Sequence, residues 1–381
     1  MDTITVALNG VTGRMGYRQH LVRSILAIRD QGGLDLGEGR KVQVEPVLVG
    51  RNEAKLRDIA QRHDVKRWST DLAAVLADDE VQVYFDAQLT SARGGALAAA
   101  IAAGKHIYTE KPVSTTVEEA VALARQAAEA GVTAGVVHDK LFLPGLLKLR
   151  RLVEGGFFGR ILSVRGEFGY WVFEGDWQEA QRPSWNYRIE DGGGIAVDML
   201  CHWNYVLENL FGRVRSVSAA AVTHVPTRWD ESGNAYDATA DDAAYAIFQL
   251  DGGVIAQINS SWCVRVHRDE LVEFQVDGTE GSAVAGLRDC VVQHRAQTPK
   301  PVWNPDLPAA FDFRAGWSQV PDNDEFDNGF KAQWELFLRD ALAGRPHVYD
   351  LMSGARGINL AQAGLAASEQ RRWVDLPELS L

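Results

Sequence analysis

The feature that most constrains the fold is a short β-branched run that leads into three evenly spaced glycines. Residues 3–8, TITVAL, predict a buried β-strand, and Gly10, Gly13 and Gly16 follow in the stretch NGVTGRMG. The next residues, YRQHLVRSILAIRD, have the pattern of a helix. Glycines between a strand and a helix allow a tight turn and let a pyrophosphate approach backbone N–H groups. The spacing therefore predicts a dinucleotide-binding turn, and a tight turn without a ligand is the alternative.

Strand-like and helix-like segments continue to alternate through the first part of the chain. Residues 81–87, VQVYFDA, and 106–109, HIYT, predict further buried strands, and 117–130 predicts a helix whose first turn is capped by Thr116. Such alternation is typical of a parallel sheet with helices on both faces. We expect a doubly wound α/β Rossmann domain over residues 1–140.

The pattern changes after residue 140. Longer segments such as AAYAIFQL and GVIAQINSSWCV alternate apolar and polar residues, and QLDGGV and VDGTEG are hairpin-like turns. We expect an α+β domain with a large, mostly antiparallel open sheet over residues 141–381, with C-terminal helices in 325–372 packing back.

Composition excludes several classes of protein. The 381 residues carry a formal net charge of −12, which argues against binding the phosphate backbone of a nucleic acid. No apolar run has the length of a membrane span, and the N-terminus lacks the features of a signal peptide. Three widely spaced cysteines do not form a disulfide framework. We expect a cytoplasmic protein with no nucleic-acid or membrane partner and no metal.

The end of the second predicted strand helps to choose the cofactor. An acidic residue there would bind the adenosine ribose diol of NAD, whereas this chain has Arg51 and Asn52. An arginine favours the 2′-phosphate of NADP through charge-assisted hydrogen bonds. It can also stack on adenine while NAD binds. The sequence therefore predicts NAD(P), with NADP slightly favoured.

Lys111 stands at the end of the predicted strand 106–109, in the stretch HIYTEKP. Ligands of a doubly wound sheet bind at the carboxyl ends of its strands, and Pro112 stiffens the loop. A lysine ammonium there can hydrogen-bond a substrate hydroxyl and stabilise a developing alkoxide. A surface lysine after a strand is the alternative.

A second candidate cluster lies in EDGGGIAVDMLCHW. Three glycines, 192–194, precede a predicted helix that carries Asp198 and His202 four residues apart, hence on one face. A carboxylate beside an imidazole suits proton transfer near neutral pH. A buried structural histidine is one alternative, and a metal pair completed by Cys201 is another.

The stretches TEKPVSTTVEEA, GGFFGRILSVRG, GGGIAVDMLCH and FLRDALAGRPHVYD together resemble the Gfo/Idh/MocA family, the superfamily of glucose–fructose oxidoreductase and inositol dehydrogenase. The resemblance implies NAD(P)-dependent oxidation or reduction of a sugar or cyclitol hydroxyl. It implies Lys111 as the contact to the substrate hydroxyl, His202 as the general acid/base and Asp198 as its partner. It also implies a homodimer or homotetramer that packs through the second-domain sheet. The sequence departs from the family at Arg93, where a histidine is usual.

Three functions stay open at this point. A dehydrogenase of a sugar, glycoside or cyclitol is the first. A redox-neutral glycosidase that oxidises C3 transiently and eliminates the aglycone is the second. A nucleotide-sensing binding protein, which the absence of Lys111 or His202 would favour, is the third.

The predicted site residues fall into three groups. The catalytic residues are Lys111, His202 and Asp198. The residues predicted to bind the cofactor are Gly10, Thr12, Gly13, Arg14, Met15, Gly16, Arg51, Asn52, Gln88, Thr90, Glu110 and Lys111. Those predicted to contact the substrate, by ring stacking or by charge, are Lys140, Trp177, Arg182, Trp185, Tyr187 and Arg188.

Overall fold

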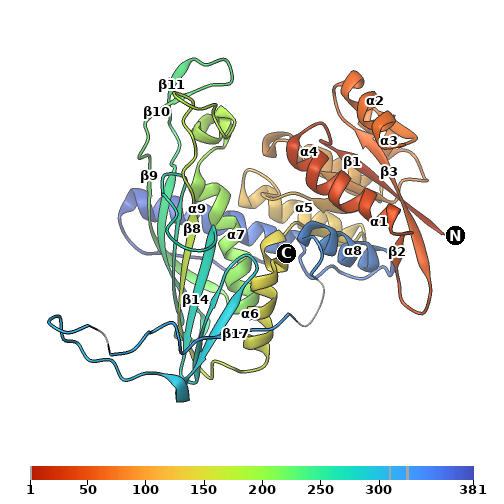
Figure 1. Cartoon of the computed structure of the whole chain (residues 1–381). Helices are drawn as coiled ribbons and strands as arrows, with labels where there is room; N and C mark the ends of the chain where they lie inside the picture. Colours follow the sequence, from red (N-terminus) through yellow and green to blue (C-terminus); the bar gives the residue numbers. More distant parts are fainter. Residues whose placement is uncertain (1, 309, 323–325) are drawn as a thin grey trace. The chain divides into compact units, whose positions relative to one another are not determined.

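The computed structural model describes residues 2–308, 310–322 and 326–381 (Figure 1). The chain divides into two compact units by its contacts. The first comprises Met1–Phe142, Asp327–Asn359 and Glu378–Leu381, and the second comprises Leu143–Phe326 and Leu360–Pro377. The boundaries predicted above, 1–140 and 141–381, describe domains that fold independently. Contacts alone do not show independent folding, so these boundaries stay a prediction.

The first unit is built on a parallel sheet in the strand order β4-β3-β1-β5-β6-β7. The short strand β2, inside the glycine-rich segment 31–40, pairs antiparallel with β3. The bounds are β1 Thr3–Asn9, β2 Leu34–Asp35, β3 Lys41–Val49, β4 Arg67–Ser69, β5 Val83–Asp86, β6 His106–Thr109 and β7 Ala134–Val136.

Helices cover both faces of this sheet, as the alternating pattern predicted. They are the π-helix η1 Gly16–Leu26, α1 Ala27–Asp30, α2 Glu53–Arg62, α3 Leu72–Leu76, α4 Thr90–Ala102, α5 Val117–Glu129, the 3₁₀ turn η2 Asp139–Phe142, α8 Gly329–Leu342 and the first part of α9 Leu351–Gln370. The helix after the glycine turn differs from expectation because its wide π turns extend over Gly16–Leu26. Helical periodicity in the sequence does not distinguish such turns from α-helix.

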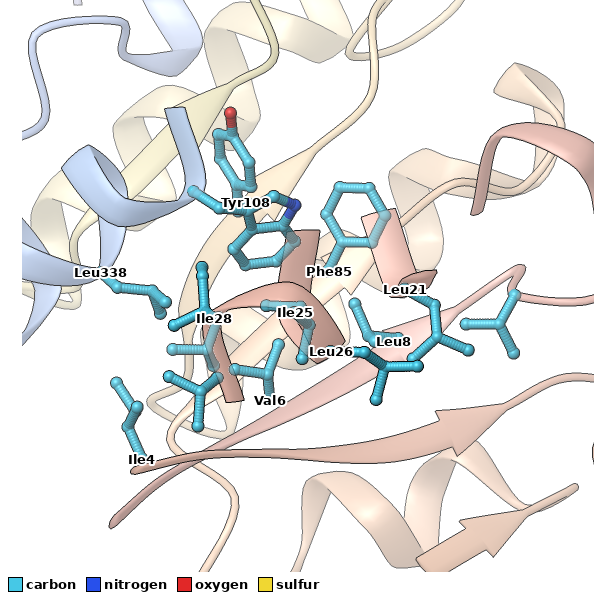
Figure 2. Close-up of a cluster of buried hydrophobic side chains, with 14 of the residues drawn as sticks. Ile4, Val6, Leu8, Leu21, Ile25, Leu26, Ile28, Phe85, Tyr108 and Leu338 are labelled. Carbon is cyan, nitrogen blue, oxygen red and sulfur yellow. The ribbon is translucent and has the colours of Figure 1, made fainter. Parts of the chain in front are cut away.

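Two apolar clusters form the core of the first unit, one on each face of the sheet. Side chains alternate along a strand, so Ile4, Val6 and Leu8 belong to one cluster and Ala7 to the other. Figure 2 shows the first cluster, in which these β1 residues lie beside Ile25 of η1 and Leu338 of α8. Helix α8 comes from late in the chain and still supplies part of this core.

The second unit is built on a nine-stranded sheet in the order β17-β16-β15-β14-β8-β13-β12-β9-β18. Its neighbouring strands pair antiparallel, apart from β8 and β13, which are parallel. The hairpins expected at QLDGGV and VDGTEG join β12 to β13 and β14 to β15. The predicted fold class is therefore confirmed for both halves of the chain.

The remaining elements of the second unit have the following bounds. The strands are β8 Ile161–Gly169, β9 Val214–Val222, β10 Thr227–Trp229, β11 Ala235–Asp237, β12 Ala243–Leu250, β13 Ile255–Ser261, β14 Val272–Gly278, β15 Gly281–Ala285, β16 Cys290–His294, β17 Ser318–Gln319 and β18 Val374–Asp375. The helices are α6 Pro144–Glu154, η3 Ser184–Tyr187, η4 Ile189–Asp191, α7 Ile195–Leu210, η5 Asp251–Gly253, η6 Arg295–Gln297 and the second part of α9.

One face of the second sheet is covered and the other is exposed. Helix α7 packs against β9, β12 and β13. Along β12 the side chains of Ala246 and Phe248 are buried, whereas Tyr245 and Ile247 are exposed. Within the described residues, no helix has both the length and the apolarity to cross a membrane.

Candidate active site

The three predicted glycines form a turn that other residues cannot adopt without strain. Gly10 has φ +88°, and a Cβ atom there would lie 2.7 Å from the backbone of Ala87. A Cβ atom on Gly16 would lie 2.4 Å from the Gly10 carbonyl oxygen, which accepts a hydrogen bond from the Gly13 N–H at 3.0 Å. Arg14 and Met15, like Gly13, are exposed at the start of the helix. An exposed turn of this kind, at a helix N-terminus, fits the pyrophosphate of a dinucleotide.

An open pocket of ≈ 600 Å³ lies beside this turn and is lined by Thr12, Arg51, Asn52, Glu53 and Lys55. Asn52 caps α2, because its side-chain oxygen accepts a hydrogen bond from the Lys55 N–H at 3.0 Å. Glu53 pairs with Arg57 along the exposed helix surface at 2.8 Å. The structure thus brings Thr12, Arg51 and Asn52 together at the glycine turn, where the adenosine half of a dinucleotide fits.

The end of β5 is organised by Asp86, which is fully buried. Its carboxylate accepts hydrogen bonds from the Gln88 backbone N–H at 2.9 Å, the Gln88 side-chain amide at 2.8 Å and the Tyr84 hydroxyl at 2.7 Å. Gln88, which was predicted to bind the cofactor, is therefore held at the end of β5 by two hydrogen bonds to Asp86. Thr90, also predicted to bind the cofactor, is the first residue of α4 and is half-buried.

Arg93 connects this strand end to the loop that carries Lys111. Its guanidinium is buried and pairs with Asp86 at 3.2 Å. It also donates hydrogen bonds to the carbonyl oxygens of Gln88 at 2.7 Å, Glu110 at 3.0 Å and Pro112. We noted Arg93 in the sequence only as a departure from the family pattern. An aspartate at the end of a buried strand, followed seven residues later by an arginine on the next helix, is the sequence signal that could have identified this ion pair.

Glu110 has one further partner, His20, which is itself hydrogen-bonded to Trp334 from late in the chain. Its Oε1 lies 2.7 Å from His20 Nε2, and the indole N–H of Trp334 donates to His20 Nδ1 at 3.0 Å. Since an indole nitrogen only donates, Nδ1 is the acceptor and Nε2 carries the proton that is donated to Glu110. Burial opposes the ionisation of Glu110. The hydrogen bond from His20 and the charges of Lys111 and Arg93 outweigh it, so the pKa of Glu110 lies below its ordinary value.

Lys111 follows Glu110 directly, and the Lys111–Pro112 peptide bond is cis. The Lys111 backbone N–H donates to Glu110 Oε2 at 3.1 Å, and its side chain is half-buried. Lys140, predicted at the edge of the substrate site, lies in the same unit and pairs with Asp139 at 2.6 Å. The first unit therefore holds the predicted catalytic lysine in a loop that Arg93 and His20 fix from two sides.

Helix α7 of the second unit carries the other two predicted catalytic residues. It begins after Gly194, where φ is +114° and a Cβ atom would lie 2.7 Å from Asp241 Oδ1. Asp241 caps the helix, because its carboxylate accepts from the Ala196 N–H at 2.7 Å and its carbonyl oxygen accepts from the Ile195 N–H at 3.0 Å. Gly194 thus permits the close approach of the aspartate that caps the helix.

His202 and Asp198 lie on α7 as predicted, and each has a defined neighbour. His202 is buried, and its Nδ1 lies 2.6 Å from the hydroxyl of Tyr205. Asp198 Oδ2 lies 3.7 Å from the guanidinium of Arg182, which is mostly buried. The sequence analysis did not predict either contact, because Arg182 lies in an irregular loop and Tyr205 was not among the predicted site residues.

The six residues predicted to contact the substrate have different environments. Trp177 is 65% exposed and touches Phe173, and Trp185 is 42% exposed. Tyr187, in contrast, is 2% exposed, with the Arg228 guanidinium over its ring at 3.8 Å. The Arg188 guanidinium lies over the ring of Tyr236 at 4.6 Å. Tyr187 is thus an interior residue of the second unit, and its ring face is already occupied by an arginine.

Among the described residues, no three histidine, cysteine, aspartate or glutamate side chains gather in a way that could hold a metal ion.

The first unit and the second unit each match a known family model. Residues 4–138 match the oxidoreductase family with an NAD-binding Rossmann fold, and residues 146–284 match the GFO/IDH/MocA C-terminal domain. The chain belongs to the Gfo/Idh/MocA family and is an oxidoreductase with a nicotinamide cofactor site. The resemblance inferred from the sequence is confirmed.

Among individual proteins, the chain is 66% identical over 382 residues to the D-xylose dehydrogenase of Paenarthrobacter nicotinovorans, covering 99% of this chain and 98% of that protein. It is 25% identical over 277 residues to the NAD⁺-dependent scyllo-inositol 2-dehydrogenase of Bacillus subtilis, covering 72% and 71% of the two chains. Among solved structures, a levoglucosan dehydrogenase in complex with NADH and L-sorbose has a TM-score of 0.80 at 20% identity, with full coverage of both chains. That last likeness concerns the fold.

Proposed function

We propose that the chain is an NAD(P)-dependent sugar dehydrogenase that oxidises D-xylose or an aldose of similar shape. The observation that carries the proposal is the 66% identity to a D-xylose dehydrogenase along nearly the whole of both chains. It is supported by Lys111, Asp198 and His202, which the sequence predicted as catalytic and which lie in ordered, hydrogen-bonded surroundings in their own units.

In this proposal each catalytic residue has a separate role. The Lys111 ammonium donates a hydrogen bond to the reacting hydroxyl oxygen and stabilises it as its proton leaves. His202 accepts that proton at Nε2, because Nδ1 already faces the Tyr205 hydroxyl. Asp198, one helical turn earlier, favours the imidazolium that results. The bound nicotinamide supplies the site that accepts hydride from the sugar carbon.

For the cofactor we propose a preference for NADP over NAD. The pocket beside the glycine turn contains Arg51 and Lys55, two exposed cations that suit a 2′-phosphate. The single acidic residue that lines it, Glu53, pairs with Arg57. An Arg51→Ala variant should raise KM for NADP⁺ about tenfold and leave KM for NAD⁺ nearly unchanged. Equal effects on both cofactors would contradict the preference.

The test of the function is a panel of free sugars and chromogenic glycosides, assayed with NAD⁺ and with NADP⁺. Nicotinamide reduction and aglycone release are followed in the same cuvette. A dehydrogenase accumulates reduced cofactor with D-xylose and releases no aglycone. Aglycone release without net cofactor reduction would instead identify the redox-neutral glycosidase and overturn the proposal. Lys111→Ala serves as the control that must lose turnover.

We further propose that the enzyme is a homo-oligomer that packs through the exposed face of its nine-stranded sheet. Tyr245, Ile247 and Ile255 are about two-fifths exposed on neighbouring strands of that face. Light scattering after size exclusion should show a dimer or tetramer, and Ile247→Lys should shift it toward the monomer. A monomeric wild-type protein would contradict this. Within the part of the chain that the structure describes, Cys201, Cys263 and Cys290 form no disulfide, which fits the reducing, cytoplasmic compartment that we also propose.

A further inference from the structure

The charge of Arg182 is matched inside the protein. Its guanidinium lies 3.7 Å from the Asp198 carboxylate and donates a hydrogen bond to the Tyr170 hydroxyl at 3.0 Å. It also lies over the ring of Trp262, 4.2 Å from the ring centroid. Burial disfavours the charged guanidinium, but Asp198 and Tyr170 outweigh it and raise the pKa of Arg182 above its ordinary value. From the sequence, Arg182 was predicted as a substrate contact, by ring stacking or by charge. The structure places it against an acidic residue of the protein.

Arg182 packs on a stack of buried rings. Trp262, beneath it, is 1% exposed and meets the ring of Tyr187 edge-on at 5.3 Å. Arg228 covers the ring of Tyr187 at 3.8 Å, and its guanidinium pairs with the fully buried Asp242 at 3.2 Å. The stack therefore contains two cations, and each has its own carboxylate. Cation–π contact and close packing hold such a side chain in one rotamer.

The other cations predicted to face the substrate are matched in the same way within their own units. Lys140 pairs with Asp139 at 2.6 Å. Lys111 adjoins Glu110, whose pKa its charge helps to lower. The pKa of Glu190 lies below its ordinary value because its carboxylate accepts hydrogen bonds from its own backbone N–H and from the Thr239 hydroxyl, with a smaller contribution from the charge of Arg188. Within the second unit, a negatively charged substituent beside Arg182 would meet a cation that already has a partner, and at Asp198 it would meet a like charge.

We propose that the Arg182–Asp198 pair makes the enzyme specific for uncharged sugars and that it rejects sugar acids of the same ring configuration. This inference rests on the proposed sugar dehydrogenase activity and names the charge class of its substrate. Arg182 is the specificity-determining residue, because a single change that removes its partner charge leaves a fixed guanidinium able to bind a carboxylate bidentately.

The experiment compares three sugars that differ only at the substituent on C5. D-xylose carries hydrogen there, D-glucose a neutral hydroxymethyl group and D-glucuronate a carboxylate. D-xylose and D-glucose are both neutral, so comparing them measures the effect of substituent size. The ratio of kcat/KM for D-glucuronate to kcat/KM for D-glucose then measures the effect of the charge. In the wild-type enzyme we expect kcat/KM for D-glucuronate to be at least about a hundredfold below that for D-glucose. In the Asp198→Asn variant we expect turnover of all three sugars to fall. We expect the ratio of kcat/KM for D-glucuronate to kcat/KM for D-glucose to rise about tenfold.

Binding of the same three sugars is measured by calorimetry in the presence of cofactor, so that the charge inference is tested separately from catalysis. An Asp198→Asn, Arg182→Met double variant should lose the gain in D-glucuronate binding, and a thermal melt of each variant verifies folding. Wild-type protein that uses or binds D-glucuronate as well as D-glucose would overturn this inference alone. Cofactor reduction with none of the sugars, despite charge-selective binding, would overturn the proposed function and leave the inference supported. If the Asp198→Asn variant fails to fold, D-glucuronate binding is measured in the Arg182→Met variant. Tighter binding there than in the wild-type protein would also overturn the inference.

Discussion

His20 Nε2 lies 2.7 Å from Glu110 Oε1, so the helix that follows the glycine turn is hydrogen-bonded to the residue before the catalytic lysine. The imidazole is fully buried and receives the indole N–H of Trp334 on its other nitrogen. This chain of three side chains joins η1, the Lys111 loop and α8 within the first unit. It gives His20 a single tautomer and gives Glu110 a fixed orientation.

Removing the indole donor should loosen this chain without emptying the core. In Trp334→Phe the aromatic packing is largely kept, but His20 Nδ1 loses its hydrogen bond, so Nε2 is no longer forced to carry the proton. We expect kcat/KM to fall about fivefold, the equivalent of about 1 kcal/mol, with little change in cofactor affinity. Steady-state kinetics and cofactor titration measure the two effects. Phe337→Leu, on the same helix face, is the control that should lower stability and leave kcat/KM unchanged.

Glu110 should make stability depend on pH in a defined direction. Its pKa in the folded protein lies below the ordinary 4.5, so its ionised form is stabilised by folding. That contribution is fully present above about pH 4.5 and is lost as pH falls through the folded-state pKa. The loss of thermal stability caused by Glu110→Gln should therefore be largest near neutral pH and shrink in acid. Melting temperatures of both proteins measured across this range would refute the assignment if their difference were constant.

Arg93 should be one of the most sensitive positions for stability in the first unit. Arg93→Met leaves the Asp86 carboxylate buried without its cation and leaves the carbonyl oxygens of Glu110 and Pro112 without their donor. We expect a loss of about 3 kcal/mol in the free energy of unfolding, together with reduced turnover because the Lys111 loop is released. Chemical denaturation measures the first effect. Arg57→Met, which breaks the exposed pair with Glu53, is the matched control and should have no measurable effect.

Asp241 should control the position of the helix that carries Asp198 and His202. Asp241→Ala removes the acceptor for the Ala196 N–H, and we expect it to lower the free energy of unfolding by about 1 kcal/mol. It should also lower kcat, because the first turn of α7 is no longer anchored. Asp241→Asn keeps an acceptor oxygen and should retain most of both properties. An Asn variant as impaired as the Ala variant would show that the charge, rather than the cap, is what matters.

Cys263 should be unreactive in the folded protein although it is only partly buried. Burial and the negative charge of Asp242 raise the pKa of its thiol from 9.0 to about 12. At pH 8 the reactive thiolate is then only about one part in ten thousand, against about one in ten at the ordinary pKa. Alkylation by iodoacetamide, followed by mass spectrometry, should label Cys263 rapidly only after unfolding in urea. Rapid labelling of the native protein would contradict the raised pKa.

What the sequence determined by itself is the part of the protein that depends on local spacing. Glycines at 10, 13 and 16 predicted the turn after β1, because φ and close backbone approach at a turn are properties of a few neighbouring residues. Asp198 and His202 were predicted to share a face of α7 because residues four apart always do so in a helix. The two sheets were predicted from the change in hydrophobic periodicity.

Only the tertiary structure decided which partners these residues have. Trp334 meets His20 across 314 positions of sequence, and no local pattern relates the two. Arg182 was predicted as a substrate contact, and folding places it against Asp198 and on Trp262, the residue that follows β13. The residue type alone determines the charge and shape of a side chain. Whether that charge is left for a substrate or matched inside the protein depends on which distant segments the packing of the core brings beside it.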